Sequence, residues 1–489
     1  MGKQLKELAR LLEAEGLLAE AAPEVYEIEC GHVTADSRRV LPGDVFVCKG
    51  AAFKPAYLES AAAAGAAAYI ARERYAADIP CMIVTDVRRA LAVSCRWAYG
   101  CPGDGLYITG ITGTKGKTTT AYILRGILDE AYGSKTALFS TSEICIGETS
   151  RATHLTTPEP PELQACFEEA VNAGCTHVVM EVSSQAMKMS RVYGEHFGLG
   201  LFLNVDEDHI GGQEHATLDE YVACKTAFLR QCDTAIVYKG TRFLDRVLAA
   251  CEGRPTILYG YDASSDAVIS NVDSGAHGSA FRLTYQGRQY DFVTSMAGRF
   301  NVENFTAAII AAMCMGIDAA TIQRAIANVY VPGRMDIREY GGFHIVIDYA
   351  HNRLSFQNLY QAVEETFDPE RIIAVFGCAG ERSDVRKRDI GIMAQQYADI
   401  IYLTADDPGF EKVTDICGQI AAYISKPCKV ITDREAAVAA ALSEARPGDA
   451  VIIAGKGSET TQRVRGSYEP YISDAGAVDA WIRSHGQSR

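Results

Sequence analysis

The fold of this chain is decided by the stretch Tyr107-Ile-Thr-Gly-Ile-Thr-Gly-Thr-Lys-Gly-Lys-Thr-Thr-Thr120. It begins with an apolar, β-branched run, passes through three glycines and closes with a lysine and three threonines. A run from Ala121 to Glu130 that favours a helix comes next. This order of strand, glycine-rich loop and helix N-terminus is typical of a phosphate-binding site, in which backbone N–H groups contact the anion.

The residues of this loop indicate how a nucleotide would be held. Gly113 and Gly116 let the backbone approach a phosphate, Lys117 can reach the terminal phosphates, and the Thr118 hydroxyl can bind Mg²⁺. The spacing is that of a short G-x-x-G-K-T variant, because Ile111 stands where the longer motif has its first glycine. The loop alone leaves open a tight strand–helix connection that binds no ligand.

Composition and charge narrow the class of protein. A chain of 489 residues is too long for one core, and its length predicts about three domains. Its content of 48% hydrophobic and 22% charged residues is that of an ordinary globular protein. With 47 Lys and Arg against 62 Asp and Glu, the net charge is −15. We therefore expect no nucleic-acid partner, although a local basic pocket for an anionic substrate stays possible.

The cysteines and the chain start bear on the compartment. The chain has 15 cysteines, an odd number, and no C-x-x-C motif. This usage favours reduced, mostly buried thiols over a disulfide framework or a zinc ribbon. No apolar run has the length of a membrane span, and the first residues contain acids and no signal-peptide core. We expect a cytoplasmic protein that is neither exported nor bound to a membrane.

Clusters of helix and strand breakers predict domain boundaries. Cys101-Pro-Gly-Asp104 and Val331-Pro-Gly-Arg334 divide the chain into domains at residues 1–104, 105–331 and 332–489. In the first domain the hydrophobic spacing predicts helices at 3–20 and 56–68 and strands at 45–48, 66–71 and 82–85.

The first domain also contains a candidate anion site. A strand that ends at Asp36-Ser37-Arg38 is followed by a Pro-Gly turn and a second strand. Ser37, Arg38 and Lys49 could gather around a phosphate. Asp36 and Ser37 could equally hydrogen-bond the backbone of the turn, which is the more common role of such residues.

In the central domain, polar side chains follow buried strands. Glu181 comes directly after Val178-Val-Met180, and ligands bind at the carboxyl ends of strands in α/β sheets. Glu181 is therefore a candidate Mg²⁺ ligand, with helix capping as the alternative. His209 also follows an apolar strand, and this shared context favours a place near the metal over a structural role.

Two later stretches of the central domain are open to more than one interpretation. Lys225 lies among apolar neighbours in a predicted helix at 218–231, so it is either buried and paired, buried and chemically modified, or a surface lysine. Asn301 and Asn304 precede a predicted helix at 305–315 and could bind a base or cap the helix. Residues 235–295 are predicted to form short strands and turns.

The third domain alternates strands and helices, which predicts a doubly wound, mostly parallel sheet. Four polar or glycine-containing loops follow its strands. The predicted strands are 343–348, 371–376, 400–404 and 450–454, and the loops are 348–352, 377–384, 404–411 and 455–459.

Seven motifs spread along the chain in order resemble those of the Mur ligase family, ATP-dependent ligases that form amide bonds in bacterial peptidoglycan synthesis. The motifs are Gly113-Thr-Lys-Gly-Lys-Thr-Thr119, Thr156-Thr-Pro158, Glu181-Val-Ser-Ser-Gln-Ala186, Asp208-His209, Gly298-Arg-Phe-Asn301, Pro332-Gly-Arg334 and Asp348-Tyr-Ala-His351.

The resemblance implies an α/β fold of three domains. These are a small N-terminal UDP-binding domain, a central P-loop-type ATP-binding domain and a C-terminal Rossmann-like, doubly wound domain. Asp36-Ser-Arg38 and Pro42-Gly-Asp-Val-Phe46 resemble the MurE type, which adds the third residue to UDP-N-acetylmuramoyl-L-alanyl-D-glutamate. The resemblance implies a cytoplasmic, monomeric enzyme of cell-wall biogenesis, and hence of cell shape and division.

The same resemblance implies roles for individual residues. ATP would be held by Gly113, Thr114, Lys115, Gly116, Lys117, Thr118, Thr119, Asn301, Arg334 and Asp348. Mg²⁺ would be held by Thr118, Glu181, His209 and Lys225, with Lys225 carbamylated by CO₂, and the catalytic residues would be Lys117, His209 and Lys225. The UDP-muramoyl dipeptide would contact Ser37, Thr156, Thr157, Ser183 and Arg191.

The identity of the added amino acid depends on two short stretches. Family members that add meso-diaminopimelate carry Asp-Asn-Pro-Arg, whose Arg pairs with the second carboxylate, and a Gly-His-Glu. This chain has Asp406-Asp-Pro-Gly409 and Gly457-Ser-Glu459 instead. A second carboxylate would lack a bidentate partner, whereas two aspartates suit a cationic end. We expect L-lysine, with ornithine or diaminopimelate as alternatives.

The amino-acid site implied by this comparison includes an arginine from a neighbouring loop. Arg382, Arg386 and Arg388 could supply a clamp for the α-carboxylate. The expected substrate contacts are Arg382, Asp406, Asp407, Pro408, Gly409 and Glu459.

The sequence disfavours two more distant functions. A ligase similar to folylpolyglutamate synthase is disfavoured, because those enzymes lack the UDP-reading N-terminal domain. A catalytically silent homologue that only binds UDP-sugar peptides is disfavoured by the intact set of Lys117, Thr118, Glu181, His209 and Lys225.

Overall fold

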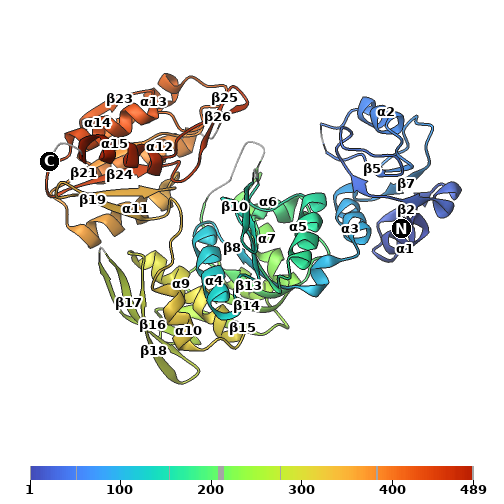
Figure 1. Cartoon of the computed structure of the whole chain (residues 1–489), viewed down its shortest axis with the longest axis horizontal. Helices are drawn as coiled ribbons and strands as arrows, with labels where there is room; N and C mark the ends of the chain where they lie inside the picture. Colours follow the sequence, from blue (N-terminus) through green and yellow to red (C-terminus); the bar gives the residue numbers. More distant parts are fainter. Residues whose placement is uncertain are drawn as a thin grey trace.

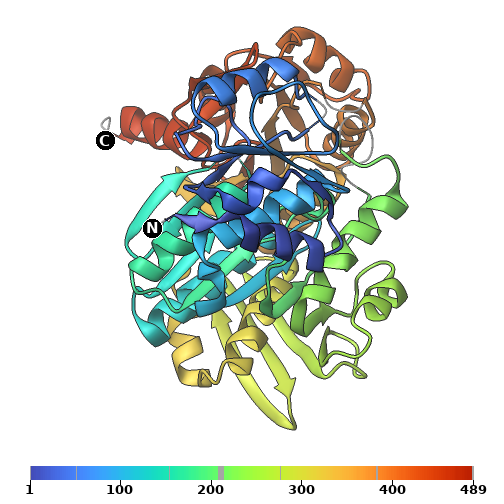
Figure 2. The same ribbon diagram turned by 90° about the vertical axis from the view of Figure 1, so that its right-hand side faces the viewer.

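The chain is arranged as three lobes along its longest axis (Figure 1). The computed structural model describes residues 2–50, 52–153, 155–207, 214–275, 277–381 and 384–486. Each lobe contains one main sheet, and the sheets have five, 11 and six strands in chain order. Figure 2 views the chain from the side of the N-terminal lobe, which lies in front of the other two.

The N-terminal lobe is a small α/β unit. Its sheet has the order β2-β7-β6-β5-β4, with β2 antiparallel to β7 and the other pairs parallel. The strands are β2 (Leu18–Ala21), β4 (Val33–Thr34), β5 (Val45–Val47), β6 (Ala68–Ala71) and β7 (Cys81–Val84). The remaining elements are β1 (Lys3–Gln4), β3 (Glu29–Cys30), η1 (Pro23–Glu27), α1 (Leu5–Ala14), α2 (Pro55–Ala63) and α3 (Val87–Tyr99).

The prediction of one helix over residues 3–20 was wrong. Helix α1 ends at Ala14, and the chain then turns at Gly16, whose φ of +66° is a conformation that L side chains rarely adopt. The residues after this turn form β2, which pairs with β7. The helix predicted over 56–68 likewise ends earlier, because Gly65, with a φ of +92°, separates α2 from β6.

The central lobe is built on a mixed sheet whose middle is parallel. The order is β11-β10-β9-β12-β8-β13-β14-β15-β16-β17-β18, and the strands from β9 to β16 run parallel. The short helix η2 (Pro102–Gly105) leads into this lobe. Its strands are β8 (Tyr107–Thr112), β9 (Thr136–Phe139), β10 (Glu143–Ile146), β11 (Thr149–Ala152), β12 (His177–Glu181), β13 (Phe197–Phe202), β14 (Cys232–Tyr238), β15 (Thr256–Gly260), β16 (Ala267–Gly275), β17 (Gly278–Tyr285) and β18 (Arg288–Thr294).

Helices cover the central sheet on both faces, as two separate buried apolar clusters show. One cluster includes α4, α9 and α10, and the other includes α5, α7 and α8. The helices are α4 (Lys117–Tyr132), α5 (Pro160–Asn172), α6 (Ser184–Lys188), α7 (Leu218–Ala227), η3 (Phe228–Gln231), α8 (Leu244–Ala250), α9 (Arg299–Cys314) and α10 (Ala319–Ile326).

Two predictions for the central lobe need correction. Residues 267–294 form three long antiparallel strands that extend the main sheet, where short strands and turns were expected. Residues of β17 alternate between buried and partly exposed, and the partly exposed positions hold Gly278, Ala280, Arg282 and Thr284. These small or polar residues interrupt the apolar pattern and hid the strand in the sequence. Helix α9 begins at Arg299, so Asn301 and Asn304 lie inside its first turns.

The C-terminal lobe is the doubly wound sheet that the sequence predicts. Its order is β19-β20-β24-β21-β22-β23, with β19 (Asp336–Tyr340) antiparallel at one edge. The other strands are β20 (Phe343–Asp348), β21 (Arg371–Phe376), β22 (Ile400–Leu403), β23 (Cys428–Val430) and β24 (Asp449–Ala454). A hairpin of β25 (Thr461–Val464) and β26 (Ser467–Pro470) follows the last strand of the sheet.

Alternate residues of the C-terminal strands enter apolar clusters on opposite faces. Ile452 of β24 packs in the cluster that contains α11 and α12, whereas Val451 and Ile453 pack in the cluster that contains α14 and α15. The helices are α11 (Arg353–Phe367), α12 (Asp384–Tyr397), α13 (Val413–Ala421), α14 (Arg434–Glu444) and α15 (Asp474–Gly486). None of the helices in the described ranges combines the length and apolar character needed to cross a membrane.

A pair of glycines determines how closely α7 and η3 pack on the central sheet. Gly110 of β8 and Gly200 of β13 are register partners on adjacent strands. A Cβ on Gly110 would lie 2.4 Å from the Phe228 ring, and one on Gly200 would lie 2.4 Å from the Cys232 sulfur. The absence of side chains at these positions lets Phe228 approach the strands, and Lys225 lies one turn earlier in the same segment.

We predict that Gly110→Ala destabilises the fold by about 2–4 kcal/mol, because the added methyl group must displace a buried aromatic ring. The measurement is the free energy of unfolding in urea. Gly275→Ala is the matched control, since Gly275 lies in β16 of the same sheet and a Cβ there would have no atom within 4 Å. Equal stability of the two variants would contradict the packing argument.

Candidate active site

The predicted phosphate loop connects the end of β8 to the start of α4. Gly116 has a φ of +87°, and a Cβ there would lie 2.3 Å from Oδ1 of Asn304, so no larger residue fits. The Lys117 ammonium donates hydrogen bonds to the carbonyls of Gly113 (2.9 Å) and Thr114 (3.4 Å). The Lys117 side chain thus folds back over the carbonyl groups of the loop.

Thr118 and Glu181, two of the predicted Mg²⁺ ligands, are in direct contact. Glu181 ends β12, the strand beside β8, and its side chain is fully buried. It accepts hydrogen bonds from the Thr118 hydroxyl (2.8 Å), the Thr141 backbone N–H (2.8 Å) and the Thr141 hydroxyl (3.1 Å). A carboxylate and a hydroxyl oxygen side by side suit Mg²⁺, which commonly takes one or two carboxylates together with substrate phosphates and water.

No larger cluster of metal-binding side chains exists in the described ranges. No group of three or more His, Cys, Asp or Glu residues there is placed to hold an ion. His209, predicted as a catalytic residue and metal ligand, lies outside the described residues. Within the described residues, a metal at Glu181 would have the Thr118 hydroxyl beside it as a further oxygen ligand.

Lys225 is buried directly beneath the phosphate loop. Its side chain is only 2% exposed, and Nζ donates a hydrogen bond of 2.7 Å to the Gly113 carbonyl. The same ammonium lies 4.8 Å from the centre of the Tyr221 ring, and the Tyr221 hydroxyl lies 2.9 Å from the Thr114 hydroxyl. Lys225 is therefore buried, and the alternative of a surface lysine is wrong.

A cavity of about 340 Å³ joins the central and C-terminal lobes at this loop. Many of the residues predicted to bind ATP or the amino acid lie on its walls. They are Thr114, Lys115, Gly116, Lys117, Thr118, Thr119, Asn301, Arg334, Asp348, Asp406, Asp407 and Glu459, with Thr156 and Glu181 between them.

The residues predicted to contact the nucleotide, Asn301, Arg334 and Asp348, are held by internal contacts. The Arg334 guanidinium lies 4.2 Å from the centre of the Tyr349 ring. Asp348 accepts hydrogen bonds from the N–H groups of Met335 (2.9 Å) and Ala350 (2.8 Å), and burial raises the pKa of its carboxyl. Asn301 donates from Nδ2 to the Ala297 carbonyl (2.8 Å).

A second cavity of about 230 Å³ adjoins the first and shares Lys117 and Thr156 with it. Its other walls include Ser183, Arg191 and Lys225. Lys117 and Thr156 therefore stand between a space on the nucleotide side and a space on the side of the predicted UDP-muramoyl dipeptide. This is the arrangement that transfer of a phosphoryl group to a second substrate needs.

Thr157 hydrogen-bonds the backbone of the turn that follows Glu181. Its side chain is fully buried, and its hydroxyl donates to the Glu181 carbonyl (2.9 Å) and accepts from the Ser183 N–H (3.1 Å). These bonds hold the turn between β12 and α6. In this structure the Thr157 side chain is thus committed to the backbone of the turn.

Charged groups also connect the N-terminal lobe to this region. Glu159 forms ion pairs with Arg191 (2.7 Å) and with Lys49 of the N-terminal lobe. Ser37 lies in the turn after β4, and the neighbouring Arg38 is exposed and paired with Asp36. Lys49 and Arg38, which were considered with Ser37 as an anion site, thus each have an acidic partner.

The acidic end of the large cavity is formed by Asp406, Asp407 and Glu459. Burial raises the pKa of the Asp406 carboxyl to about 6, against the opposing effect of the nearby Lys456 and Arg434. Lys456 is 2% exposed and pairs with Asp407 (2.8 Å) and Glu459 (2.5 Å). Carboxylates gathered in this way favour a cationic ligand over an anionic one.

Pro408 and Gly409 lie behind this acidic cluster. The Gly409 N–H donates to the Arg463 carbonyl (2.9 Å), and the Arg465 N–H donates to the Gly409 carbonyl (2.7 Å), so the loop pairs with the β25–β26 hairpin. The φ of Gly409 is +59°. Of the three candidate arginines, Arg382 lies outside the described residues, Arg386 lines the cavity and Arg388 pairs with Asp389.

Sequence reasoning missed several residues of the site. Thr141 comes shortly after β9 and belongs to no recognisable motif. Glu159 lies in a proline-rich loop and carries no signal of its own. Lys456 was noted only as part of a loop, although a lysine between two glycines after a buried strand was a usable signal. Their partners are distant in the sequence, so their roles became visible only in the fold.

Comparison with known proteins identifies the family. The "Mur ligase middle domain" profile matches residues 111–312, and the "Mur ligase, glutamate ligase domain" profile matches residues 333–457. A UDP-N-acetylmuramyl-tripeptide synthetase of Lactobacillus delbrueckii subsp. bulgaricus is 38% identical, covering 90% of this chain and 91% of that protein. A UDP-N-acetylmuramoyl-L-alanyl-D-glutamate--L-lysine ligase of Streptococcus thermophilus is 36% identical, covering 91% of each chain.

A solved structure extends the likeness to the whole fold. The structure of a UDP-N-acetylmuramoyl-L-alanyl-D-glutamate--2,6-diaminopimelate ligase superposes with a TM-score of 0.70, covering 99% of this chain and 100% of that one at 24% identity. All three lobes therefore have counterparts in a protein of known structure. The identity to the relatives and the two matched profiles show that this chain belongs to the Mur ligase family.

Proposed function

We propose that this Mur ligase uses ATP to join L-lysine to the γ-carboxylate of the D-glutamate in UDP-N-acetylmuramoyl-L-alanyl-D-glutamate, a step of peptidoglycan precursor synthesis. The observation that carries the proposal is the single cavity that reaches from the phosphate loop to Asp406, Asp407 and Glu459. Its contact with the second cavity at Lys117 supplies a meeting point for ATP, acceptor and amino acid.

The reaction proceeds in two steps. The γ-carboxylate oxygen of the dipeptide attacks the γ-phosphorus of ATP, and the bond to the β-phosphate oxygen breaks to give an acyl phosphate and ADP. The α-amine of lysine then attacks the acyl carbon, and inorganic phosphate leaves from the tetrahedral intermediate. The chain contributes mainly position and charge: Lys117 and the N–H groups at the start of α4 would face the transferred phosphoryl group, whereas the N–H groups of Thr114 and Lys115 donate to Asn204.

The metal set follows the resemblance and the contacts at the loop. Thr118 and Glu181 would hold one Mg²⁺ with the phosphates, and His209 with a carbamylated Lys225 would hold another. Bound Mg²⁺ supplies positive charge at the phosphate oxygens. Lys225 suits carbamylation, because addition of its uncharged amine to CO₂ replaces a buried cation with an anionic oxygen ligand next to Gly113.

Charge in the C-terminal lobe supports lysine over diaminopimelate. Asp406 and Asp407 would meet the side-chain ammonium of lysine, whereas the second carboxylate of diaminopimelate would approach both of them. Position 409, where diaminopimelate-adding members carry an arginine, is a glycine with a left-handed backbone. The relative from S. thermophilus, which is named a lysine ligase, supports the same choice. Ornithine and diaminopimelate remain the competing substrates.

The proposed division of labour follows the three domains at 1–104, 105–331 and 332–489. The first would bind the UDP through Ser37, the second would bind ATP and the dipeptide, and the third would bind the amino acid, with Arg382 or Arg386 at its α-carboxylate. We place the reaction in the cytoplasm and on a monomer. None of the fifteen cysteines forms a disulfide, and all of them lie in the described ranges, which fits a reducing compartment.

The direct test is phosphate release with ATP, Mg²⁺ and the UDP-muramoyl dipeptide, comparing L-lysine, L-ornithine and meso-diaminopimelate. We expect kcat/KM for lysine to exceed that for diaminopimelate by at least ~100-fold, because the latter leaves a carboxylate against two aspartates. Lys117→Ala should lose turnover with an unchanged unfolding midpoint. Preference for diaminopimelate would reject the lysine assignment, and phosphate release with none of the three would reject the ligation itself.

Asp406→Asn should separate binding from stability. The folded-state pKa of about 6 lies above the ordinary 3.8, so stability from the protonated carboxyl is lost as the pH rises between these values. Near pH 8 the free energy of unfolding of the variant should therefore exceed that of the parent by about 1–3 kcal/mol. This difference should shrink towards pH 4.5. Its KM for lysine should rise by at least ~10-fold. A less stable variant near pH 8 would contradict the argument.

Lys225→Ala should lower kcat by at least ~100-fold, because the site loses a metal ligand beneath the phosphate loop. A short carboxylic acid added to the assay should restore part of the activity by supplying the missing oxygen ligand. Lys239→Ala is the control, since Lys239 pairs with Asp262 in the same lobe outside both cavities. Full activity of the Lys225 variant without additive would argue against a carbamate.

A further inference from the structure

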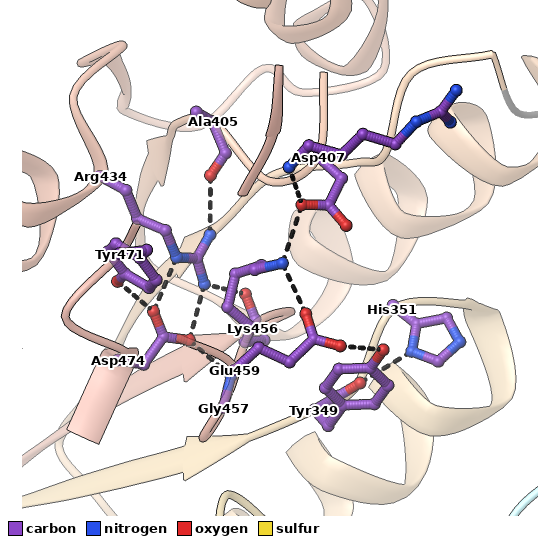
Figure 3. Close-up of polar contacts among 12 residues, drawn as sticks. Tyr349, His351, Ala405, Asp407, Arg434, Lys456, Gly457, Glu459, Tyr471 and Asp474 are labelled. Carbon is purple, nitrogen blue, oxygen red and sulfur yellow. Dashed lines mark hydrogen bonds and ion pairs between the residues drawn. The ribbon is translucent and has the colours of Figure 1, made fainter. Parts of the chain in front are cut away.

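Lys456 lies at the centre of the acidic end of the large cavity, and Figure 3 shows its ammonium between Asp407 and Glu459. We propose that Lys456 is a positioning residue for amino-acid selection, an internal cation that stays in place while the ammonium of the substrate binds. Its presence sets both the net charge of the pocket and the direction of the carboxylates that receive lysine. This inference rests on the proposed function and assigns a role to a residue outside the expected substrate contacts.

Lys456 lowers the net negative charge of the acidic pocket. Asp406, Asp407 and Glu459 would bring three negative charges into a largely buried pocket, and Lys456 reduces the total to two. A bound lysine side chain reduces it further to one. Without Lys456 a single substrate ammonium would face three carboxylates, and at least one of them would take up a proton to relieve the repulsion.

The carboxylates of the pocket differ in the hydrogen bonds that their oxygens accept. One oxygen of Asp407 accepts from the Lys456 ammonium and from the Arg463 N–H (2.9 Å). Glu459 is held by Lys456 through one oxygen and by the Tyr349 hydroxyl (2.7 Å) through the other. Asp406 accepts no hydrogen bond from any residue in the described ranges. Lys456 thus engages two carboxylates and leaves Asp406 open to the incoming ammonium.

Buried contacts hold the backbone on both sides of Lys456 in place. The guanidinium of Arg434 pairs with Asp474 (2.7 Å) and donates to the carbonyl of Ala405 (3.0 Å) (Figure 3). It also donates to the carbonyl of Ala454 (2.8 Å). Asp474 also accepts from the Gly457 N–H (2.8 Å). One buried ion pair therefore links the loop of Asp406 to the loop of Lys456.

Gly455 makes this close approach possible. Its φ is +120°, and a Cβ there would lie 2.5 Å from Oδ2 of Asp406. The turn that directs Lys456 inward is therefore built against the carboxylate that remains open. Lys456 is too deeply buried and too well paired to be displaced without separating these contacts, so we infer that it remains when substrate binds.

The opposite role makes the opposite prediction. If the Lys456 ammonium only filled the place of the substrate's ammonium, it would compete with lysine, and its removal would lower KM for lysine. The sign of the KM change upon loss of the charge therefore distinguishes a supporting cation from a competitor.

The experiment measures kcat and KM for lysine, ATP and the UDP-muramoyl dipeptide in Lys456→Met and Lys456→Gln. We expect KM for lysine to rise by at least ~10-fold, because Asp407 and Glu459 lose the ammonium that orients them and keeps them ionised. KM for ATP should change less than about 2-fold, because the change is confined to the amino-acid pocket. The KM for lysine should also become steeper with pH between about 6 and 8, since the remaining carboxylates hold a proton more tightly. Lys456→Arg should restore part of the affinity.

Lys429→Met is the matched control, because Lys429 also pairs with a carboxylate and a tyrosine of the same lobe, at Glu444 and Tyr402, but does not line the cavity. It should leave every KM unchanged. Lys456→Gln keeps a hydrogen-bond donor, so it serves if Lys456→Met does not fold. An unchanged or lower KM for lysine would overturn the inference. Failure of the unmodified enzyme to use lysine would instead reject the proposed function.

Discussion

The hydrogen bond from the buried Lys225 ammonium to the Gly113 carbonyl joins the parts on which the site depends. It connects α7 to the phosphate loop, and it exists because the glycine pair Gly110 and Gly200 lets Phe228 settle against the sheet. Strand, loop and helix are thereby held in one arrangement. A preorganised loop of this kind needs little rearrangement when charge develops on a transferred phosphoryl group.

The site lies where two lobes are continuous and a third is attached by other means. One buried apolar cluster includes Ile111 of the central sheet and Ile452 of the C-terminal sheet, so these lobes share packing. Among the described residues, the buried clusters of the N-terminal lobe contain only its own residues, and the partly buried Tyr193 of the central lobe packs against one of them. That lobe contacts the centre through α3 beside α5 and through Glu159, which pairs with Lys49 and Arg191.

Patterns local in the sequence predicted the parts of the fold that local physics governs. The glycine-rich loop with Lys117, and the strands β20, β21 and β24, follow from apolar runs bounded by glycine or polar residues. The single helix predicted over residues 3–20 failed because Gly16 ends it. The long strands β16 to β18 were missed because their exposed positions mix polar and small residues with apolar ones, so that no clear alternation marks them in the sequence.

The sequence by itself determined the family motifs, the phosphate loop and the acidic character of the Asp406-Asp407 stretch. Only the tertiary structure decided that Asp407 and Glu459 are tied to Lys456 and that Asp406 is the carboxylate left open. The physical reason is distance along the chain. The loops that meet at Lys456 belong to strands β22 and β24, and no local pattern of residues specifies which ends of a parallel sheet a buried pair such as Arg434 and Asp474 will bring together.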